Sequence, residues 1–112
     1  MTNPPLAGRA CVPCSGDTPP ISAAQARAMM GDLDGWVLND PATTIEKRFE
    51  FKGFAKAVEM ANLAAWLGNR HGHHPDIRFG WGYCVVSFTT HAAGGLTEND
   101  FICAARLDAL LA

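Results

Sequence analysis

The stretch TTIEKRFEFKGFAKAVEMANLAAWLGN, residues 43–69, contains two different hydrophobic periods. In residues 43–51 apolar and charged side chains alternate, which predicts a half-buried β-strand. Lys47 breaks the apolar parity, so we expect it near an end or an edge of the sheet. From Phe54 onward the apolar residues recur every three or four positions, which predicts a helix that ends between residues 67 and 69.

Shorter elements flank this strand and helix. The predicted elements are a helix over 23–30 after a Ser22–Gln25 capping box, a strand over 36–38, a strand over 76–79, a β-rich run over 83–91 and a final helix that Thr97 caps. The order is helix, strand, strand, helix, strand, strand, helix, which has too few long strands for a doubly wound parallel sheet. Short turns favour an α+β fold, an antiparallel sheet with helices packed on one face.

Composition limits the class of protein. The chain has 112 residues, a length that suits one domain. Its residues are 48% hydrophobic and 18% charged, a composition that excludes an intrinsically disordered chain. The net charge of −2 argues against direct nucleic-acid binding, which needs a basic face. There is no apolar run long enough to span a membrane and no signal-peptide pattern, so we expect a cytoplasmic protein without a membrane partner.

The N-terminal segment differs from the rest of the chain. Five of the seven prolines lie in residues 1–20, which predicts an extended, Pro-rich arm before a single α+β domain over residues 21–112. The arm contains a CxxC pair, Cys11 and Cys14, but neither the strand–helix context of a redox motif nor a second pair for zinc. We interpret the pair as part of a packed or exposed arm, and all four cysteines as free thiols.

All four histidines fall between residues 71 and 91. Three interpretations fit this clustering: a polar loop with incidental histidines, a metal site, and metal-free general acid–base catalysis by imidazoles. The spacing matches no closed structural zinc pattern, and adjacent His73 and His74 usually point in different directions. The residues alone do not separate a metal site from acid–base catalysis.

Several linked motifs resemble the signature of one family, the pterin-4a-carbinolamine dehydratases. In chain order they are HHPDI at residues 73–77, an aromatic residue at 81, TTH at 89–91 and GGLTENDF at 94–101. The similarity covers about residues 21–111, and the CVPC segment with its following prolines resembles the longer bacterial and plant-type members. Because the motifs are linked over most of the chain, they are far more specific than any one of them.

The resemblance implies loss of water from a 4a-hydroxytetrahydropterin to give a quinonoid dihydropterin. Aromatic amino-acid hydroxylases make this carbinolamine, so a link to their pathway is implied. One group must protonate the leaving hydroxyl and another must take the N5 proton, and neither a metal nor a cofactor is required. The implied catalytic residues are His73 and His91 as acid and base, with His74 binding and orienting the pterin.

Further site residues follow from the same resemblance. Asp100 is implied in steadying the site, although a residue that only caps the last helix explains it equally well. Thr90 and Trp81 are candidates for the pocket wall. Asn69 stands where the family commonly has an acidic residue, and an amide cannot raise an imidazole pKa through charge.

The family also implies a fold and an alternative function. Its fold is a four-stranded antiparallel sheet with helices on one face, assembled as a homodimer or homotetramer, in agreement with the element order above. Some relatives are binding proteins, either stabilising dimers of a homeodomain transcription factor or resembling assembly factors of the carbon-fixing carboxylase. The three histidines at positions 73, 74 and 91 favour the enzyme.

Overall fold

The computed structural model describes residues 5–13 and 16–111 and has the predicted order of elements. Its helices and strands are η1 (Leu6–Gly8), α1 (Ala23–Met29), η2 (Met30–Asp32), β1 (Val37–Leu38), β2 (Ile45–Glu50), α2 (Phe54–His71), β3 (Asp76–Gly80), β4 (Tyr83–Phe88), η3 (His91–Ala93) and α3 (Glu98–Leu111). The capping box of Ser22 and Gln25 is present at the start of α1. The α+β class and the antiparallel four-stranded sheet are confirmed.

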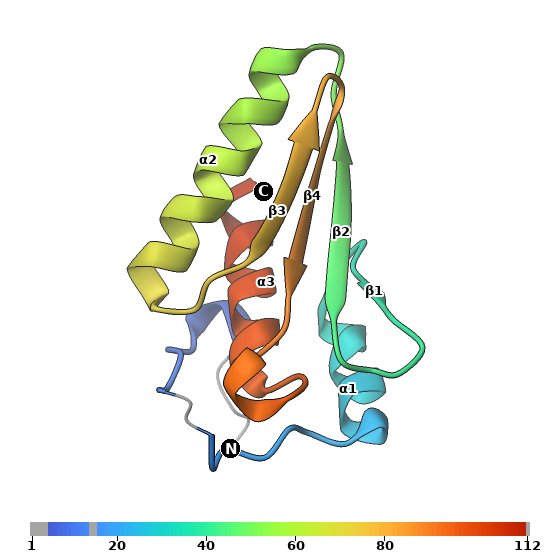
Figure 1. The fold of residues 1–112 in the computed structure, drawn as a ribbon, viewed down its shortest axis with the longest axis vertical. Coiled ribbons are helices and arrows are strands. Elements are labelled where there is room, and N and C mark those ends of the chain that lie inside the picture. The colour runs from blue at the N-terminus through green and yellow to red at the C-terminus, as the bar shows by residue number, and fades with distance from the viewer. Residues whose placement is uncertain (1–4, 14–15, 112) are drawn as a thin grey trace.

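The sheet has the strand order β1-β2-β4-β3, and every neighbouring pair is antiparallel. The two long central strands pair along their whole length, from Ile45 opposite Phe88 to Glu50 opposite Tyr83. A tight turn joins β3 to β4, and Figure 1 shows this hairpin with its turn at one end of the molecule. The opposite end of the hairpin, where β3 begins and β4 ends, is therefore next to the loops that lead into α3.

Helices α2 and α3 pack side by side against β3 and β4, as Figure 1 shows. The side chains of Cys84, Val86 and Phe88 alternate along β4 and are fully buried on the helix side. They meet buried side chains of both helices, among them Ala64, Leu67, Phe101, Cys103 and Leu107. Among the described residues, none of the helices is both long and apolar enough to span a membrane.

Lys47 lies in β2 on the same parity as Ile45, the core side of the sheet, and just past the last residue that β1 pairs with. Its ammonium donates to the Asp108 carboxylate at 2.9 Å and to the Asp34 carbonyl at 2.8 Å. Asp108 also accepts a hydrogen bond from the Trp36 indole at 3.0 Å. A charged residue is therefore tolerated at this parity because α3 supplies its counter-charge.

The β-rich run over 83–91 is shorter than predicted. Strand β4 ends at Phe88, and His91 begins the 3-10 helix η3 instead of ending a strand. The chain turns because Thr90 pairs with Gly95 in an isolated bridge, and Gly94 between them adopts a left-handed conformation with φ of 73°. This turn carries the side chains of Thr90 and His91 to the end of the sheet.

The predicted extended arm is partly folded. Residues 6–8 form the short 3-10 helix η1, and Leu6 is buried against α3. The guanidinium of Arg106 on α3 donates to the Arg9 carbonyl, and Arg9 pairs with Glu98. The apolar side chain of Leu6 explains this difference, since burying it stabilises a docked arm. Cys14 of the CxxC pair lies outside the described residues.

Candidate active site

The end of α2 fixes the position of His73. Gly72 closes the helix in a left-handed conformation, and the amides of Gly72 and His73 both donate to the Gly68 carbonyl. Gly68 itself lies against the returning chain: a Cβ placed there would be 2.6 Å from the Pro75 ring and 3.2 Å from the His73 carbonyl. The chain therefore leaves the helix in one tight path that carries the two adjacent histidines to the end of the sheet.

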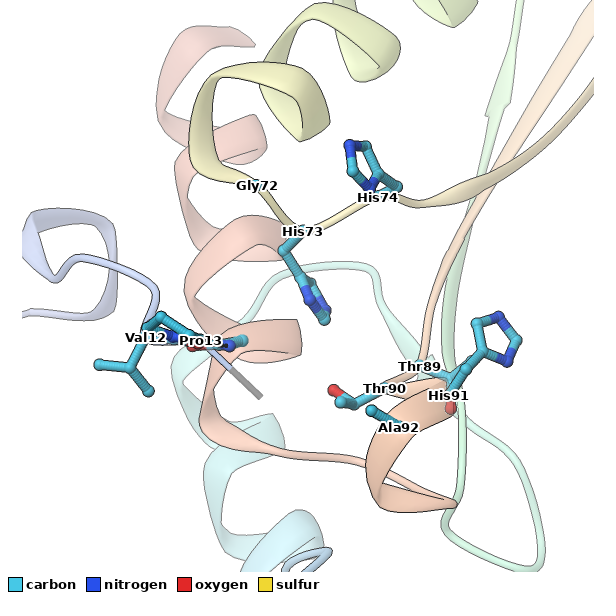
Figure 2. Close-up of a pocket in the computed structure, with 10 residues that line it drawn as sticks. Val12, Pro13, Gly72, His73, His74, Thr89, Thr90, His91 and Ala92 are labelled. Carbon is cyan, nitrogen blue, oxygen red and sulfur yellow. Dashed lines mark hydrogen bonds between the residues drawn. The ribbon is translucent and has the colours of Figure 1, made fainter. Parts of the chain in front are cut away.

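A hollow of about 230 Å³ lies at this end of the sheet. Its lining residues are Val12, Pro13, Gly72, His73, His74, Thr89, Thr90, His91, Ala92 and Asn99. Figure 2 shows the His73 ring reaching into the space between the Val12–Pro13 segment and Thr90. The hollow thus joins four parts of the chain: the arm, the loop after α2, the turn after β4 and the start of α3.

Asp100 lies behind His73 and is fully buried. One carboxylate oxygen is 2.5 Å from the His73 Nε2. The other accepts hydrogen bonds from the Thr90 hydroxyl at 2.8 Å and from the Thr97 amide at 2.9 Å. A buried carboxylate requires such donors, and this set holds it in one orientation. Asp100 therefore caps the start of α3 through the Thr97 amide and at the same time contacts His73.

The environment of His73 shifts its pKa in two opposing ways. Burial alone lowers the pKa of His73, but the hydrogen bond that its ring donates to Asp100 and the negative charge of that carboxylate more than offset this effect. The pKa of His73 is therefore raised above its ordinary value of 6.5. The ring also stacks on Phe88, with centroids 6.1 Å apart and planes within 11°. His73 is thus a firmly held imidazole whose protonated form the buried carboxylate stabilises.

His74 and His91 line the same hollow but are exposed. Figure 2 shows the His74 ring turned away from Thr90 and the His91 ring at the side of the hollow nearest β4. The His91 Nε2 is 3.8 Å from the Asp76 carboxylate, a long contact between two exposed side chains. The three histidines that the family resemblance selects therefore line one hollow, and of the three His73 is the one braced by a buried carboxylate.

The arm forms a wall of this hollow that the sequence reasoning missed. The Asn99 side chain accepts from the Val12 amide at 2.9 Å and donates to the Val12 carbonyl at 2.6 Å. This paired arrangement holds Val12 and Pro13 next to the histidines. Asn99 lies inside the GGLTENDF motif, so the sequence singled out this segment. Its partner Val12 is 87 residues away, and no local pattern in the sequence indicated that contact.

Two predicted site residues lie elsewhere in this chain. Trp81 is 72% exposed and sits in the turn between β3 and β4, at the end of the hairpin away from the histidines. Asn69 is exposed on α2 and is not among the residues that line the hollow. Within the described part of the chain, no three His, Cys, Asp or Glu side chains are grouped so that they could hold a metal ion.

Comparison with known proteins now adds an independent observation. The family model described as pterin 4 alpha carbinolamine dehydratase matches residues 19–110. The chain belongs to this family. A relative in Nitrosospira multiformis is 48% identical over 94% of this chain and 91% of its own length. One in Methylococcus capsulatus is 44% identical over 96% of this chain and 94% of its own. Both carry the provisional name pterin-4-alpha-carbinolamine dehydratase.

Solved structures of the pterin dehydratase family share this fold. A protein described as a transcriptional coactivator/pterin dehydratase from Brucella melitensis superposes with a TM-score of 0.75 at 27% identity, over 83% of this chain and 99% of that one. A pterin dehydratase-like protein, identified as a RuBisCO assembly factor in the alpha-carboxysome, gives 0.57 at 28% identity, over 69% and 89%. The fold is therefore shared by proteins described with catalytic and with non-catalytic roles.

Proposed function

We propose that this protein dehydrates 4a-hydroxytetrahydropterin to the quinonoid dihydropterin by histidine acid–base catalysis. Family membership supports the reaction, and one observation in the structure supports the mechanism: His73, His74 and His91 line a single hollow, with Asp100 braced behind His73. The substrate class is a pterin carrying a hydroxyl on C4a, which an aromatic amino-acid hydroxylase would produce.

The reaction asks little of the protein beyond proton transfer. The hydroxyl on C4a leaves as water once an acid protonates its oxygen, and a base takes the proton from N5. The electron pair of that N–H bond then forms the double bond between N5 and C4a, so no oxidant or reductant takes part. Acid–base groups work best with a pKa near the working pH, which suits imidazoles.

We assign these steps to two imidazoles. His73 reaches into the hollow, and its raised pKa keeps a larger share of it protonated, which favours the role of acid for the leaving hydroxyl. His91, across the hollow on the turn after β4, is then the base for N5. His74, on the neighbouring position of the loop, contacts and orients the pterin, and Thr90 contributes to the wall.

The deciding experiment is dehydration of enzymatically generated 4a-hydroxytetrahydropterin, followed by ultraviolet absorbance with and without the protein. The reaction also proceeds unaided, so we compare rates. We expect acceleration that His73→Ala lowers by about 10²-fold or more. His71→Ala is the matched control, because His71 lies two positions earlier and lines a different hollow between α2 and α3.

The same assay tests the alternative of a binding protein on this fold. If the folded protein gives no acceleration, or if His73→Ala accelerates as well as the unchanged chain, the proposed mechanism is wrong. A binding role in assembly, dimerisation or transcriptional co-activation would then become the leading hypothesis. One structural neighbour is described as a transcriptional coactivator/pterin dehydratase and the other as a RuBisCO assembly factor. Asn69, which stands where the family commonly has an acidic residue, would be the first position to examine as the cause of the lost activity.

We also propose that the protein assembles as a homodimer or homotetramer. Large apolar side chains are exposed on the outer strand and the adjoining helix, where Phe54 and Phe79 contact each other, and exposed Trp81 follows β3 in the turn. Such side chains gain stability when a second copy covers them. Light scattering at micromolar concentration should give a multiple of the 12.0 kDa chain mass, and a strictly monomeric mass would contradict this proposal.

A further inference from the structure

Two cysteines from distant parts of the sequence meet beside the candidate active site. The Sγ atoms of Cys11 in the arm and Cys103 in α3 are 3.4 Å apart, although 92 residues separate them. Cys103 is fully buried in the core, whereas Cys11 is only partly buried. The distance is longer than the ~2.05 Å of a disulfide bond, so the two are thiols in this structure.

The arm is held at this place by several contacts on both sides of Cys11. The Asn99 side chain binds both backbone groups of Val12, and the Arg106 guanidinium donates to the Arg9 carbonyl at 2.8 Å. The Cys11 thiol also lies 3.9 Å from the Asn99 carbonyl. The two sulfur atoms are therefore kept together by neighbours on α3, and not only by their own contact.

The surroundings make the two thiols chemically different. The pKa of Cys11 is lowered to about 7, first by the hydrogen bond from the Cys103 thiol, and further by the charges of His73 and Arg106, which outweigh its partial burial. The pKa of Cys103 is raised by its hydrogen bond to Cys11 and by burial. Since the thiolate is the nucleophile, Cys11 is the sulfur that attacks an oxidant first, and Cys103 is the resolving cysteine that forms the disulfide with it.

We propose that Cys11 and Cys103 are a peroxide-sensitive thiol pair, whose disulfide tethers the N-terminal arm to α3 beside the histidines. In the first step the Cys11 thiolate attacks hydrogen peroxide: an S–O bond forms, the O–O bond breaks and hydroxide leaves, which gives a sulfenic acid. In the second step the Cys103 sulfur displaces the hydroxyl from Cys11: an S–S bond forms, the S–O bond breaks, and the hydroxyl leaves as water with the Cys103 proton. The thiols lose two electrons and the peroxide gains them.

The tether would act on a wall of the hollow. Val12 and Pro13 follow Cys11 directly and line the hollow, while Cys103 is one helical turn beyond Asn99 and Asp100. In the reduced protein, hydrogen bonds hold Val12 and Pro13 in the wall of the hollow. The disulfide would fix this segment there covalently. Because it would join residues 92 positions apart, it would also restrict the unfolded chain and raise the melting temperature.

The test uses the full chain, reduced and then treated with hydrogen peroxide. We expect the intact mass to fall by two hydrogen atoms, and a non-reducing digest to contain one cross-linked peptide pair joining Cys11 to Cys103. A reducing agent should reverse both changes. The readout is a mass, so it does not depend on whether the protein is a dehydratase.

Three variants identify the partner of Cys11. Cys14→Ser and Cys84→Ser should still form the cross-link, since neither sulfur belongs to the pair. Cys103→Ser should lose it and leave a sulfenic acid on Cys11 that dimedone traps. A cross-link from Cys11 to Cys14, or peroxide treatment that leaves Cys11 and Cys103 unlinked in the unchanged protein, would overturn the proposal. If Cys103→Ser does not fold, the digest of the unchanged protein still shows whether Cys11 and Cys103 are cross-linked.

Discussion

His73 and Asp100 are 27 residues apart in the sequence, and the Nε2 of the first lies 2.5 Å from a carboxylate oxygen of the second. That carboxylate also accepts from the Thr90 hydroxyl and from the Thr97 amide at the start of α3. The hydrogen bond engages Nε2 of the ring with Asp100, so in the proposed mechanism Nδ1 is the ring nitrogen that would face the substrate. One buried side chain thus connects the loop after α2, the turn after β4 and the first turn of α3.

Replacing this carboxylate by an amide should lower the pKa of His73. Asp100→Asn removes the negative charge and keeps the shape, so burial is no longer outweighed. A proton NMR titration of the His73 ring should therefore give a lower pKa than in the unchanged protein. Asp76→Asn is the control, because Asp76 is exposed and contacts His91 instead. An unchanged pKa of His73 in Asp100→Asn would contradict this account.

The raised pKa of His73 also predicts how stability depends on pH. The folded state binds this proton more tightly than the unfolded state, so the extra free energy of unfolding is fully present below about pH 6.5. It is lost as the pH rises through the raised pKa. Denaturant unfolding of the unchanged protein and of His73→Gln from acid to alkaline pH should show a difference that shrinks as pH rises. A difference that grows with pH would reverse the sign of our argument.

His91 should matter for turnover and little for folding. Its side chain is exposed and its contact with Asp76 is long, so His91→Ala removes almost no packing. We expect turnover to fall by about 10²-fold, the scale of a lost acid–base group, with an unchanged unfolding midpoint. Rate and unfolding measurements on the same sample check both statements. A His73→Ala, His91→Ala double variant that keeps the full rate would remove both assignments.

Gly68 should tolerate no larger residue. In Gly68→Ala the new methyl group would meet the Pro75 ring at 2.6 Å and the His73 carbonyl at 3.2 Å, so the loop that carries the histidines must move. We expect lower stability, by about 1–3 kcal/mol for such overpacking, together with slower dehydration. Gly31→Ala is the matched control, since a Cβ there meets nothing within 4 Å. Equal stability of the two variants would show that the loop after α2 moves aside at no cost, which would contradict this prediction.

The Asp108 carboxylate should be important for stability. It accepts from the Lys47 ammonium at 2.9 Å and the Trp36 indole at 3.0 Å, and the Lys47 and Asp108 side chains are mostly shielded from water. Asp108→Ala removes the acceptor of the Trp36 indole and the counter-charge of Lys47, whose ammonium keeps its bond to the Asp34 carbonyl. We expect this loss to cost about 1–3 kcal/mol in denaturant unfolding. Glu59→Ala breaks an exposed pair with Lys56 and should change stability by less than about 1 kcal/mol. A similar loss in both variants would argue against this difference.

Local patterns were sufficient to predict most of the elements. The alternation in residues 43–51 predicted β2, and the spacing after Phe54 predicted α2, because each pattern has the period of its own structure. The end of β4 was predicted too late. A β-favouring composition continues through Thr89 and Thr90, and the bridge from Thr90 to Gly95 that ends the strand depends on the turn between them.

The candidate site was predicted less completely, for a physical reason. Three histidines were found from their spacing and the family resemblance, but the wall formed by Val12 and Pro13 was not. That wall depends on contacts between the arm and α3, such as the one from Asn99 to Val12, which join residues 87 positions apart. Hydrophobic periodicity describes neighbours along the chain, so it contains no information about such docking. For the same reason no pattern in the sequence indicated that Cys11 and Cys103 lie in contact.

The double role of Asp100 affects how sequences of this family should be compared. A relative that no longer performs chemistry would still gain from a carboxylate that accepts the Thr97 amide and begins the last helix. An aspartate at this position is therefore a marker of the fold. The histidine at position 73 contributes no comparable cap to a helix. If it is the acid that we propose, its presence or loss is the better marker for sorting catalytic members from those that only bind.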